Sequence, residues 1–339
     1  MVSSDRYNQT TFGIESHFER YSWVVYHFFV LLSSLIGDTL ILYASVKKCV
    51  FKLNKFVVTV IQYIAVTDLM YTLIGVLPRT IALLADSWVL GDELCYARVY
   101  LGYFFYQIGM CLIALLTTSK YLLLKFPIRC GNWAKKMAHR ICILTSIPAS
   151  ISPVLFLVVD KNDVEFDYRT YTCDYMFNFN TSKKRLLHVA STLICLLNFI
   201  IVGTTIPTLK YLADARKSAR RVQGSVPWQG AVAVALTAVV YCISTLPSVI
   251  YYTLLALDFF QKSSASLLQI QFTRVAKFMQ MINIVSNFYI YTLTIKSFRG
   301  YLLSRVTSVQ PLVSKPSRNT ASPGVNCKIT SDNLASNSV

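Results

Sequence analysis

Long apolar runs constrain this chain more than any other feature of its sequence. A helix needs roughly 20 apolar residues to cross the hydrocarbon core of a bilayer, which is about 30 Å thick. Seven segments reach that length, over residues 22–46, 56–80, 97–124, 140–159, 186–211, 231–257 and 268–295. We therefore expect an all-α membrane protein built as a bundle of seven transmembrane helices.

Composition and charge agree with this expectation. Only 14% of the residues are charged and 54% are hydrophobic, whereas a soluble domain carries about 25% charged residues. The net charge of +17 could suggest nucleic-acid binding. However, the basic residues lie in short clusters between the apolar runs and form no single stripe among aromatic residues. We expect a lipid bilayer as the surroundings and no nucleic-acid partner.

The basic clusters also predict how the chain is oriented. They fall in the first, second and third connections on one side of the predicted bundle and again after residue 296, with few acids among them. Basic connections remain in the cytoplasm. This places residues 1–21 outside, in a multi-pass protein of the plasma membrane. Two glycosylation sequons, at Asn8 and Asn180, lie on the expected outer side.

Two of the nine cysteines lie outside the predicted spans on the outer side. Cys95 begins the third span, and Cys173 lies in the second outer loop. Cysteines in an oxidising compartment commonly pair, so we expect a disulfide that ties this loop to the third span. The alternative is a pair of free thiols.

Enzyme signatures are missing from the sequence. It contains no Gly-rich phosphate loop, HExxH or CxxC motif, and its four histidines are scattered along the chain. We expect no catalytic site and no enzymatic activity.

Several short motifs, in order and at matching intervals, are similar to those of the rhodopsin-like (class A) G-protein-coupled receptors. They are Gly37-Asp38, Ala65–Asp68, the Trp88/Gly91/Cys95 spacing, Ser119-Lys120-Tyr121, Tyr211, Pro247, Asn287–Tyr291 and Phe298. The resemblance covers about residues 22–306. It implies an extracellular ligand, a heterotrimeric G protein as partner, and a short eighth helix. The chain is a divergent member, because Lys120 replaces the family's arginine and Phe288 replaces a proline.

The resemblance also implies a cytoplasmic switch. Its residues would be Ser119, Lys120, Tyr121, Tyr211, Pro247, Asn287 and Tyr291. Ser119 cannot form the family's restraining ion pair, and lysine lacks the planar fork of arginine. We expect a weakened restraint, with Tyr211 and Tyr291 reaching Lys120 when the sixth span swings outward at Pro247. The alternative is that Lys120 only anchors the inner end of its span, with its stem reaching water.

Buried polar residues form a second implied site. By resemblance, Asp68, Asn283 and Asn287 would line a sodium site, although Gly109 replaces a serine ligand. Asp38 adds a second carboxylate close by. Two carboxylates in low dielectric do not both ionise without a cation, so either one is protonated or Na⁺ is bound. We favour protonation, with no cofactor required.

The ligand class is narrowed by two positions. Gly102 stands where amine receptors carry an aspartate, and Met281 stands where opsins carry the retinal lysine. A peptide or another non-amine, non-retinal ligand is expected. Candidate pocket residues are Gly102, Phe105, Tyr106, Tyr251, Tyr252 and Lys277. The acids of the second outer loop could attract a cationic peptide, or could simply be solvated.

The C-terminal region is expected to leave the bundle. Residues 296–306 have helical spacing of apolar residues and should lie flat on the inner leaflet. Residues 307–339 are rich in Ser, Thr, Asn and Pro and are expected to be disordered, with hydroxyls available to a receptor kinase and then to an arrestin. Two alternatives remain open for the whole chain: an atypical receptor that does not couple to G proteins, and a seven-span transporter or channel.

Overall fold

The structure is a computed structural model, which describes residues 17–47, 51, 53–126, 137–147, 164–167, 170–175, 181–219, 228–256 and 267–307. Its main helices are α1 (His17–Val46), α2 (Lys55–Tyr71), α3 (Leu77–Ala85), α4 (Asp92–Lys125), Met137–Ile147, α6 (Thr181–Ala219), α7 (Trp228–Ala256), α8 (Leu267–Thr294) and α9 (Lys296–Thr307). A π-helical turn, η2 (Thr72–Val76), joins α2 to α3. Two strands, β1 (Val164–Asp167) and β2 (Thr172–Tyr175), complete the described elements.

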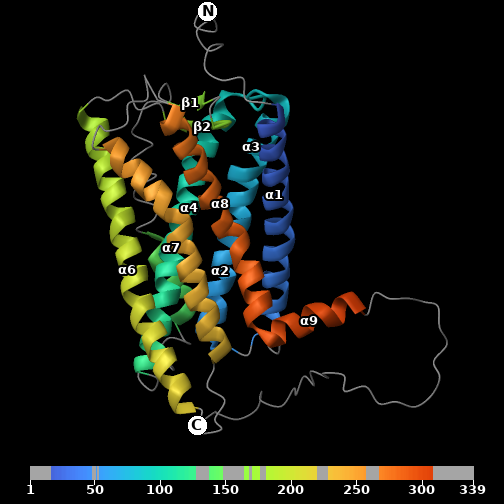
Figure 1. Cartoon of the computed structure of the whole chain (residues 1–339), viewed down its shortest axis with the longest axis vertical. Helices are drawn as coiled ribbons and strands as arrows, with labels where there is room; N and C mark the ends of the chain where they lie inside the picture. The colour runs from blue at the N-terminus through green and yellow to red at the C-terminus, as the bar shows by residue number, and fades with distance from the viewer. Residues whose placement is uncertain are drawn as a thin grey trace, which may run out of the picture.

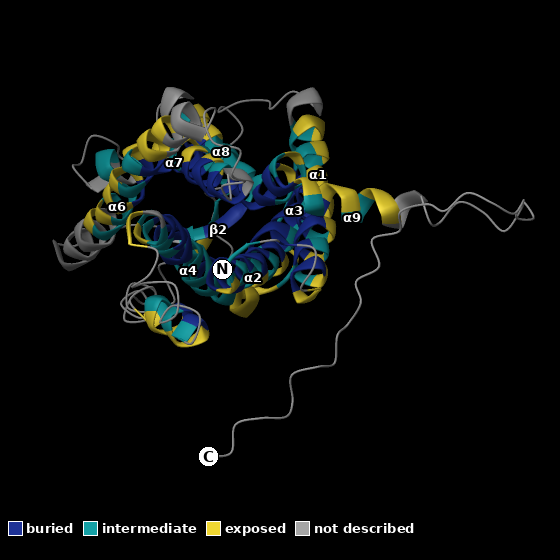
Figure 2. Ribbon diagram, turned by 90° about the horizontal axis from the view of Figure 1, so that it is seen from below, coloured by how far each residue is buried: buried dark blue, intermediate teal, exposed yellow. Residues whose placement is uncertain are grey.

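The long helices form a bundle with different structures at its two ends. The β1–β2 hairpin covers one end, and α9 turns sideways at the other (Figure 1). Around the bundle, α7 packs against α6 and α8, α8 packs against α1, and α2 packs against α1 and α4. Viewed along the helices, buried residues face the inside of this ring and exposed residues face outward (Figure 2).

Apolar side chains cover the outside of the bundle, and buried polar side chains lie among apolar ones in its interior. Phe199 and Leu293 are 76% and 72% exposed, although both lie within long helices. Inside, Asp38, Asp68 and Thr72 are buried. A soluble protein would carry polar side chains on its outer face, but in a bilayer that face contacts lipid and buried polar groups find their partners between helices.

Five described stretches are long and apolar enough to cross a membrane, which makes the chain a multi-pass membrane protein. They are Arg20–Val46, Lys55–Ala85, Asp92–Leu123, Thr192–Tyr211 and Gly230–Tyr251. The more polar α8 coincides with the seventh predicted span. Helix Met137–Ile147 covers the start of the fourth, whose remainder lies outside the described residues. The full count of seven spans stays a prediction, as does the position of α9 on a membrane surface.

The second predicted span is divided by a change in helix type. Pro78 lies in the first turn of α3 and has no N–H to continue the regular backbone ladder. The wider π-helical turn η2 directly precedes it. Such turns alter which face of the helix the following residues occupy. Arg79, one residue beyond the proline, is buried in the bundle.

The hairpin is tied to α4 by the expected disulfide. Cys95 and Cys173 are bonded, with their Cα atoms 5.5 Å apart. Strands β1 and β2 pair in antiparallel register, and Phe166 lies opposite Cys173. Trp88, Val99 and Phe166 pack around the disulfide. The prediction of a Cys95–Cys173 bond is confirmed, and the small hairpin is an addition to the all-α expectation.

Helix α9 is held to the bundle by aromatic packing. Phe298 is fully buried and stacks on Phe51, with ring centroids 5.1 Å apart. It also meets Phe288 of α8 edge to face. The apolar residues expected along this segment therefore differ in their role, because Phe298 belongs to the bundle core.

Candidate functional site

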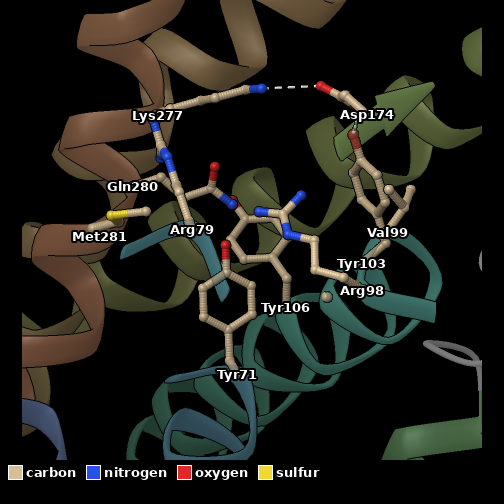
Figure 3. Close-up of a pocket in the computed structure, with 11 residues that line it drawn as sticks. Tyr71, Arg79, Arg98, Val99, Tyr103, Tyr106, Asp174, Lys277, Gln280 and Met281 are labelled. Atoms are coloured by element: carbon tan, nitrogen blue, oxygen red, sulfur yellow. Dashed lines mark hydrogen bonds and ion pairs between the residues drawn. The ribbon is translucent and has the colours of Figure 1, made fainter. Parts of the chain in front are cut away.

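A pocket beneath the hairpin is the principal candidate site. Its cavity volume is about 50 Å³. The lining residues come from α2, α3, α4, β2 and α8, and they are Tyr71, Arg79, Arg98, Val99, Gly102, Tyr103, Tyr106, Asp174, Lys277, Gln280 and Met281 (Figure 3). A cavity of this size has room for a few water molecules or for one small polar group of a ligand.

Helical spacing on α4 places three lining residues in one row. Arg98, Gly102 and Tyr106 are separated by four residues each, so they lie on successive turns of the same face. Nothing lies within 4 Å of the position that a Cβ of Gly102 would occupy. The missing side chain at Gly102 therefore leaves space in the middle of the row.

An ion pair closes the side of the pocket nearest the hairpin. Lys277 Nζ lies 3.0 Å from Asp174 Oδ2 and also donates to Thr170 Oγ1 at 3.2 Å. The Tyr103 hydroxyl donates to Asp174 Oδ1 at 3.1 Å. Both oxygens of Asp174 are thus engaged, and the pair links α8 to the hairpin and to α4.

Two arginines enter the pocket and donate hydrogen bonds to backbone carbonyls of the hairpin. Arg79 Nε donates to the Thr170 carbonyl at 3.0 Å, and Arg98 Nη1 donates to the Cys173 carbonyl at 2.6 Å. Arg79 is 4% exposed. Within the described residues, neither arginine forms an ion pair with a carboxylate.

The structure brings together only part of the predicted ligand pocket. Gly102, Tyr106 and Lys277 line it, whereas Phe105 lines a second, deeper cavity. Tyr251 is buried but lines neither cavity. The side chain of Tyr252 lies outside the described part of the chain.

Sequence reasoning missed the two arginines and Tyr71. A signal for Arg79 was present, because a charged residue at the end of an apolar run is a functional candidate by default. A signal for Arg98 was also present, since Arg98 follows Cys95 by three residues and must face the loop that the disulfide holds.

The deeper cavity has a volume of about 20 Å³ and adjoins the buried polar residues. Tyr71, Tyr106 and Gln280 line both cavities, while Asp68, Gly109 and Asn283 line only the deeper one. The shared side chains therefore connect the outer pocket to the interior of the bundle.

Both buried carboxyl groups are partly hydrogen bonded. Asn287 Nδ2 donates to Asp68 Oδ2 at 2.9 Å, and Ser34 Oγ donates to Asp38 Oδ2 at 2.7 Å. The Ser34 hydroxyl also lies 2.7 Å from that of Thr72. The structure thus brings Asp68 and Asn287 into direct contact, while Asp38 is hydrogen bonded to Ser34.

Three buried oxygens in this polar group have no hydrogen-bond partner among the described residues. They are Asp38 Oδ1, Asn283 Oδ1 and Asn287 Oδ1. Buried acceptors need a donor, a water molecule or a cation. A small cation would suit such a set of oxygens, but the described residues contain no cluster of three or more His, Cys, Asp or Glu that could hold a metal. The favoured protonation of one carboxyl and the alternative of bound Na⁺ therefore both stay predictions.

Lys120 is more deeply buried than expected. It is 6% exposed, so its stem does not extend into water in this conformation. The reason is packing from distant parts of the chain. A Cβ placed on Gly230, near the start of α7, would lie 3.7 Å from Lys120 Nζ and would clash with Leu53 Cδ2. The described residues offer Lys120 no ion-pair partner.

The other predicted switch residues do not all gather around Lys120. Tyr291 is 1% exposed inside the bundle, whereas Tyr211 is 50% exposed on α6. The hydroxyl of Ser119 donates to the Leu116 carbonyl of its own helix at 3.0 Å. Tyr121 accepts a hydrogen bond from Lys125 at 3.2 Å, and Pro247 lies inside α7.

Some predicted positions lie outside the described residues. They are the sequons at Asn8 and Asn180, the acids Asp160 and Asp163, and residues 308–339 of the tail.

The chain matches a known protein family. Residues 37–291 match the sequence model of the family described as 7 transmembrane receptor (rhodopsin family), which covers most of the chain. A search among curated proteins found no significant match.

Proposed function

Because the chain belongs to the rhodopsin family of seven-transmembrane receptors, we propose that it is a cell-surface receptor that binds an extracellular ligand and activates a heterotrimeric G protein. The basic clusters support an orientation with the hairpin end outside and α9 inside the cell. The site is a binding site, and the protein acts on its partners through a change of conformation.

One observation carries this proposal: the outer pocket and the buried polar group share side chains. Tyr71, Tyr106 and Gln280 line both cavities. A ligand that moves any of these three side chains also changes the surroundings of Asp68 and Asn283. Buried polar groups have few ways to be satisfied, so such a change favours a different packing of the helices.

Movement of α7 would transmit this change to the cytoplasmic end. Pro247 interrupts the backbone ladder of α7 and supplies a hinge. At the start of α7, Gly230 lies against Leu53 and Lys120. Outward movement of α7 would uncover Lys120, which then offers a cation to the G protein and becomes accessible to Tyr211 and Tyr291.

The ligand is a peptide or another compound that is neither an amine nor retinal. Gly102 and Met281 both line the pocket, and neither offers the carboxylate or the amine that those ligands need. Of the acids in the described part of the second outer loop, Asp174 is engaged by Lys277 and Tyr103. A receptor kinase and an arrestin would act on the tail after activation.

The test is a panel of heterotrimeric G proteins in cells that express the full chain. Activation is measured by energy transfer between labelled G-protein subunits, without ligand and with a peptide library. We expect one G-protein class to respond, and we expect Lys120→Ala to abolish the response at equal surface expression. Ser119→Asp should lower the ligand-free signal, because it restores an acid beside Lys120, while Ser119→Asn should not.

A receptor that does not couple is the second candidate, and Ser119 and Lys120 favour it because they replace the usual acid and arginine. That reading predicts ligand binding with no response from any G protein. A transporter or channel would instead show uptake or current that depends on expression of the chain.

A further inference from the structure

Within the described residues, two guanidinium groups that face one small pocket have no carboxylate partner. Among the charged residues that line it, Lys277 is paired with Asp174, and Arg79 and Arg98 remain. The charges of the two arginines are close enough to interact with each other. Asp167 of β1, which does not line the pocket, offsets part of this charge.

We propose that this pocket binds an anionic group of the ligand, a carboxylate or a phosphate, between Arg79 and Arg98. This assignment rests on the proposed receptor function, since it names the chemical class of ligand that the same pocket takes.

The geometry leaves donors free for such a group. Each arginine donates to one backbone carbonyl of the hairpin, and a guanidinium has five N–H donors. Arg98 Nε is buried and has no hydrogen-bond partner among the described residues. Figure 3 shows the guanidinium of Arg98 and the hydroxyl of Tyr71 directed toward the middle of the pocket.

Electrostatics favour an anion over any neutral occupant. Two cations held near each other in a region of low dielectric repel, and an unpaired buried charge is costly. An anion between them removes both costs. Guanidinium groups bind carboxylates and phosphates through paired N–H donors, so the match is geometric as well as electrostatic.

The size of the cavity limits what enters it. A volume of about 50 Å³ accepts a carboxylate or phosphate group but not a whole peptide. The rest of the ligand would therefore extend past the hairpin. A peptide that inserts its C-terminal carboxylate fits both this pocket and the ligand class proposed above.

The experiment measures binding on the purified full chain in lipid nanodiscs, with no G protein present. Thermal unfolding is followed with succinate, inorganic phosphate or neutral succinamide, at constant ionic strength set with sodium chloride. We expect succinate or phosphate to raise the melting temperature in a saturable way, and succinamide to have no effect. The response to each anion distinguishes a carboxylate site from a phosphate site.

Substitutions of the two arginines test whether the anion binds between them. Arg98→Gln and Arg79→Gln should each weaken anion binding at least about tenfold, as expected for loss of a charge-assisted hydrogen bond. Arg98→Lys, which keeps the charge but loses the fork, should fall between Arg98→Gln and the wild type. The matched control is Arg20→Gln, because Arg20 pairs with Asp86 at the same end of the bundle but does not line the pocket.

Two results would overturn the proposal: no anion-dependent shift in the wild-type chain, or a shift that survives both Arg79→Gln and Arg98→Gln. If one of these two variants does not fold, the anion-dependent shift of the other variant tests the proposal. A ligand-free G-protein response of the full chain in cells would still support the receptor function, so the two ideas fail separately.

Discussion

At the scale of single residues, two carboxyl groups are buried near the middle of the bundle, where their negative charges would repel each other. Asp38 and Asp68 interact electrostatically, and each accepts one hydrogen bond, from Ser34 and Asn287 respectively. Asp38 Oδ1 has no partner among the described residues. A proton on one carboxyl removes the repulsion and supplies a donor without any metal ion.

Asp38→Asn tests this interpretation. An amide is neutral and has nearly the shape of a protonated carboxyl, so we expect a melting temperature within a few degrees of the wild type. We also expect ligand binding that is insensitive to sodium in both proteins. Thermal unfolding and binding in sodium or choline chloride measure these effects. Sodium stabilisation of the wild type that Asp38→Asn removes would show instead that a cation is bound. Asn287→Ala serves as the comparison, since it leaves Asp68 unsatisfied and should cost about 1–3 kcal/mol.

A close approach between α1 and α8 depends on one glycine. A Cβ on Gly37 would lie 2.7 Å from the Cβ and Cγ of Phe288. We expect Gly37→Ala to lower the stability by about 1–3 kcal/mol, because the aromatic side chain must move within a packed core. Gly203→Ala is the matched control, since nothing lies within 4 Å of the added atom.

Thermal unfolding of both variants measures this difference. In the background of Phe288→Ala, the penalty of Gly37→Ala should largely disappear. An equal loss in both backgrounds would show that the contact with Phe288 is not its cause.

At the scale of elements, the start of α7 packs closely against two other parts of the chain. It rests on the connection after α1 and on the end of α4, through Leu53 and Lys120. A residue larger than glycine at position 230 would collide with Leu53. Under the proposed function, this steric packing would take the place of an ion pair in holding α7 inward.

Gly230→Val tests this packing. Added carbon atoms must displace Leu53 or α7 itself, and moving α7 outward resembles activation. We expect a several-fold increase in ligand-free G-protein activation at equal surface expression. Gly203→Val is the control, because Gly203 is exposed on α6. Combining Gly230→Val with Leu53→Ala should restore part of the wild-type signal. An unchanged signal in Gly230→Val would contradict this role for the contact.

Much of the fold could be predicted from the sequence, because its cause is local. Apolar runs of sufficient length become helices in a bilayer, and α1, α4, α6, α7 and α8 lie where these runs were found. The positions of Gly102, Tyr106 and Lys277 in the outer pocket followed from their spacing relative to recognisable motifs.

Features that depend on distant contacts could not be predicted in this way. Lys120 is buried because Leu53 and Gly230 meet over it, and no local pattern links these three residues. The hairpin strands have only four residues each, which is too short for a clear alternation of apolar and polar residues. The inward position of Arg79 follows from the π-helical turn before Pro78.

At the scale of the whole molecule, the disulfide joins the hairpin to the bundle. Cys173 is bonded to α4, and its carbonyl accepts from Arg98. The Thr170 carbonyl, three residues earlier, accepts from Arg79. The disulfide therefore supports the pocket as well as the fold.

Cys173→Ser should lower the melting temperature by several degrees and abolish ligand binding. Removing a native disulfide typically costs about 2–5 kcal/mol, and here it also releases the two carbonyl groups that hold the arginines. Cys195→Ser, at a free cysteine of α6, is the matched control and should bind normally. On intact cells, a membrane-impermeant maleimide should not label Cys95 unless a reductant is added first. Labelling without reductant would show that the bond is absent.

The backbone hydrogen bonds between the hairpin and the two arginines have a consequence for the evolution of this receptor. Carbonyl oxygens belong to the main chain, and every amino acid supplies one. Substitutions at Thr170 therefore change the side chain that a ligand meets at the pocket entrance, while the backbone carbonyl still holds Arg79 in place. Such an arrangement lets selectivity drift from one compound to another without rebuilding the site that recognises their common charge.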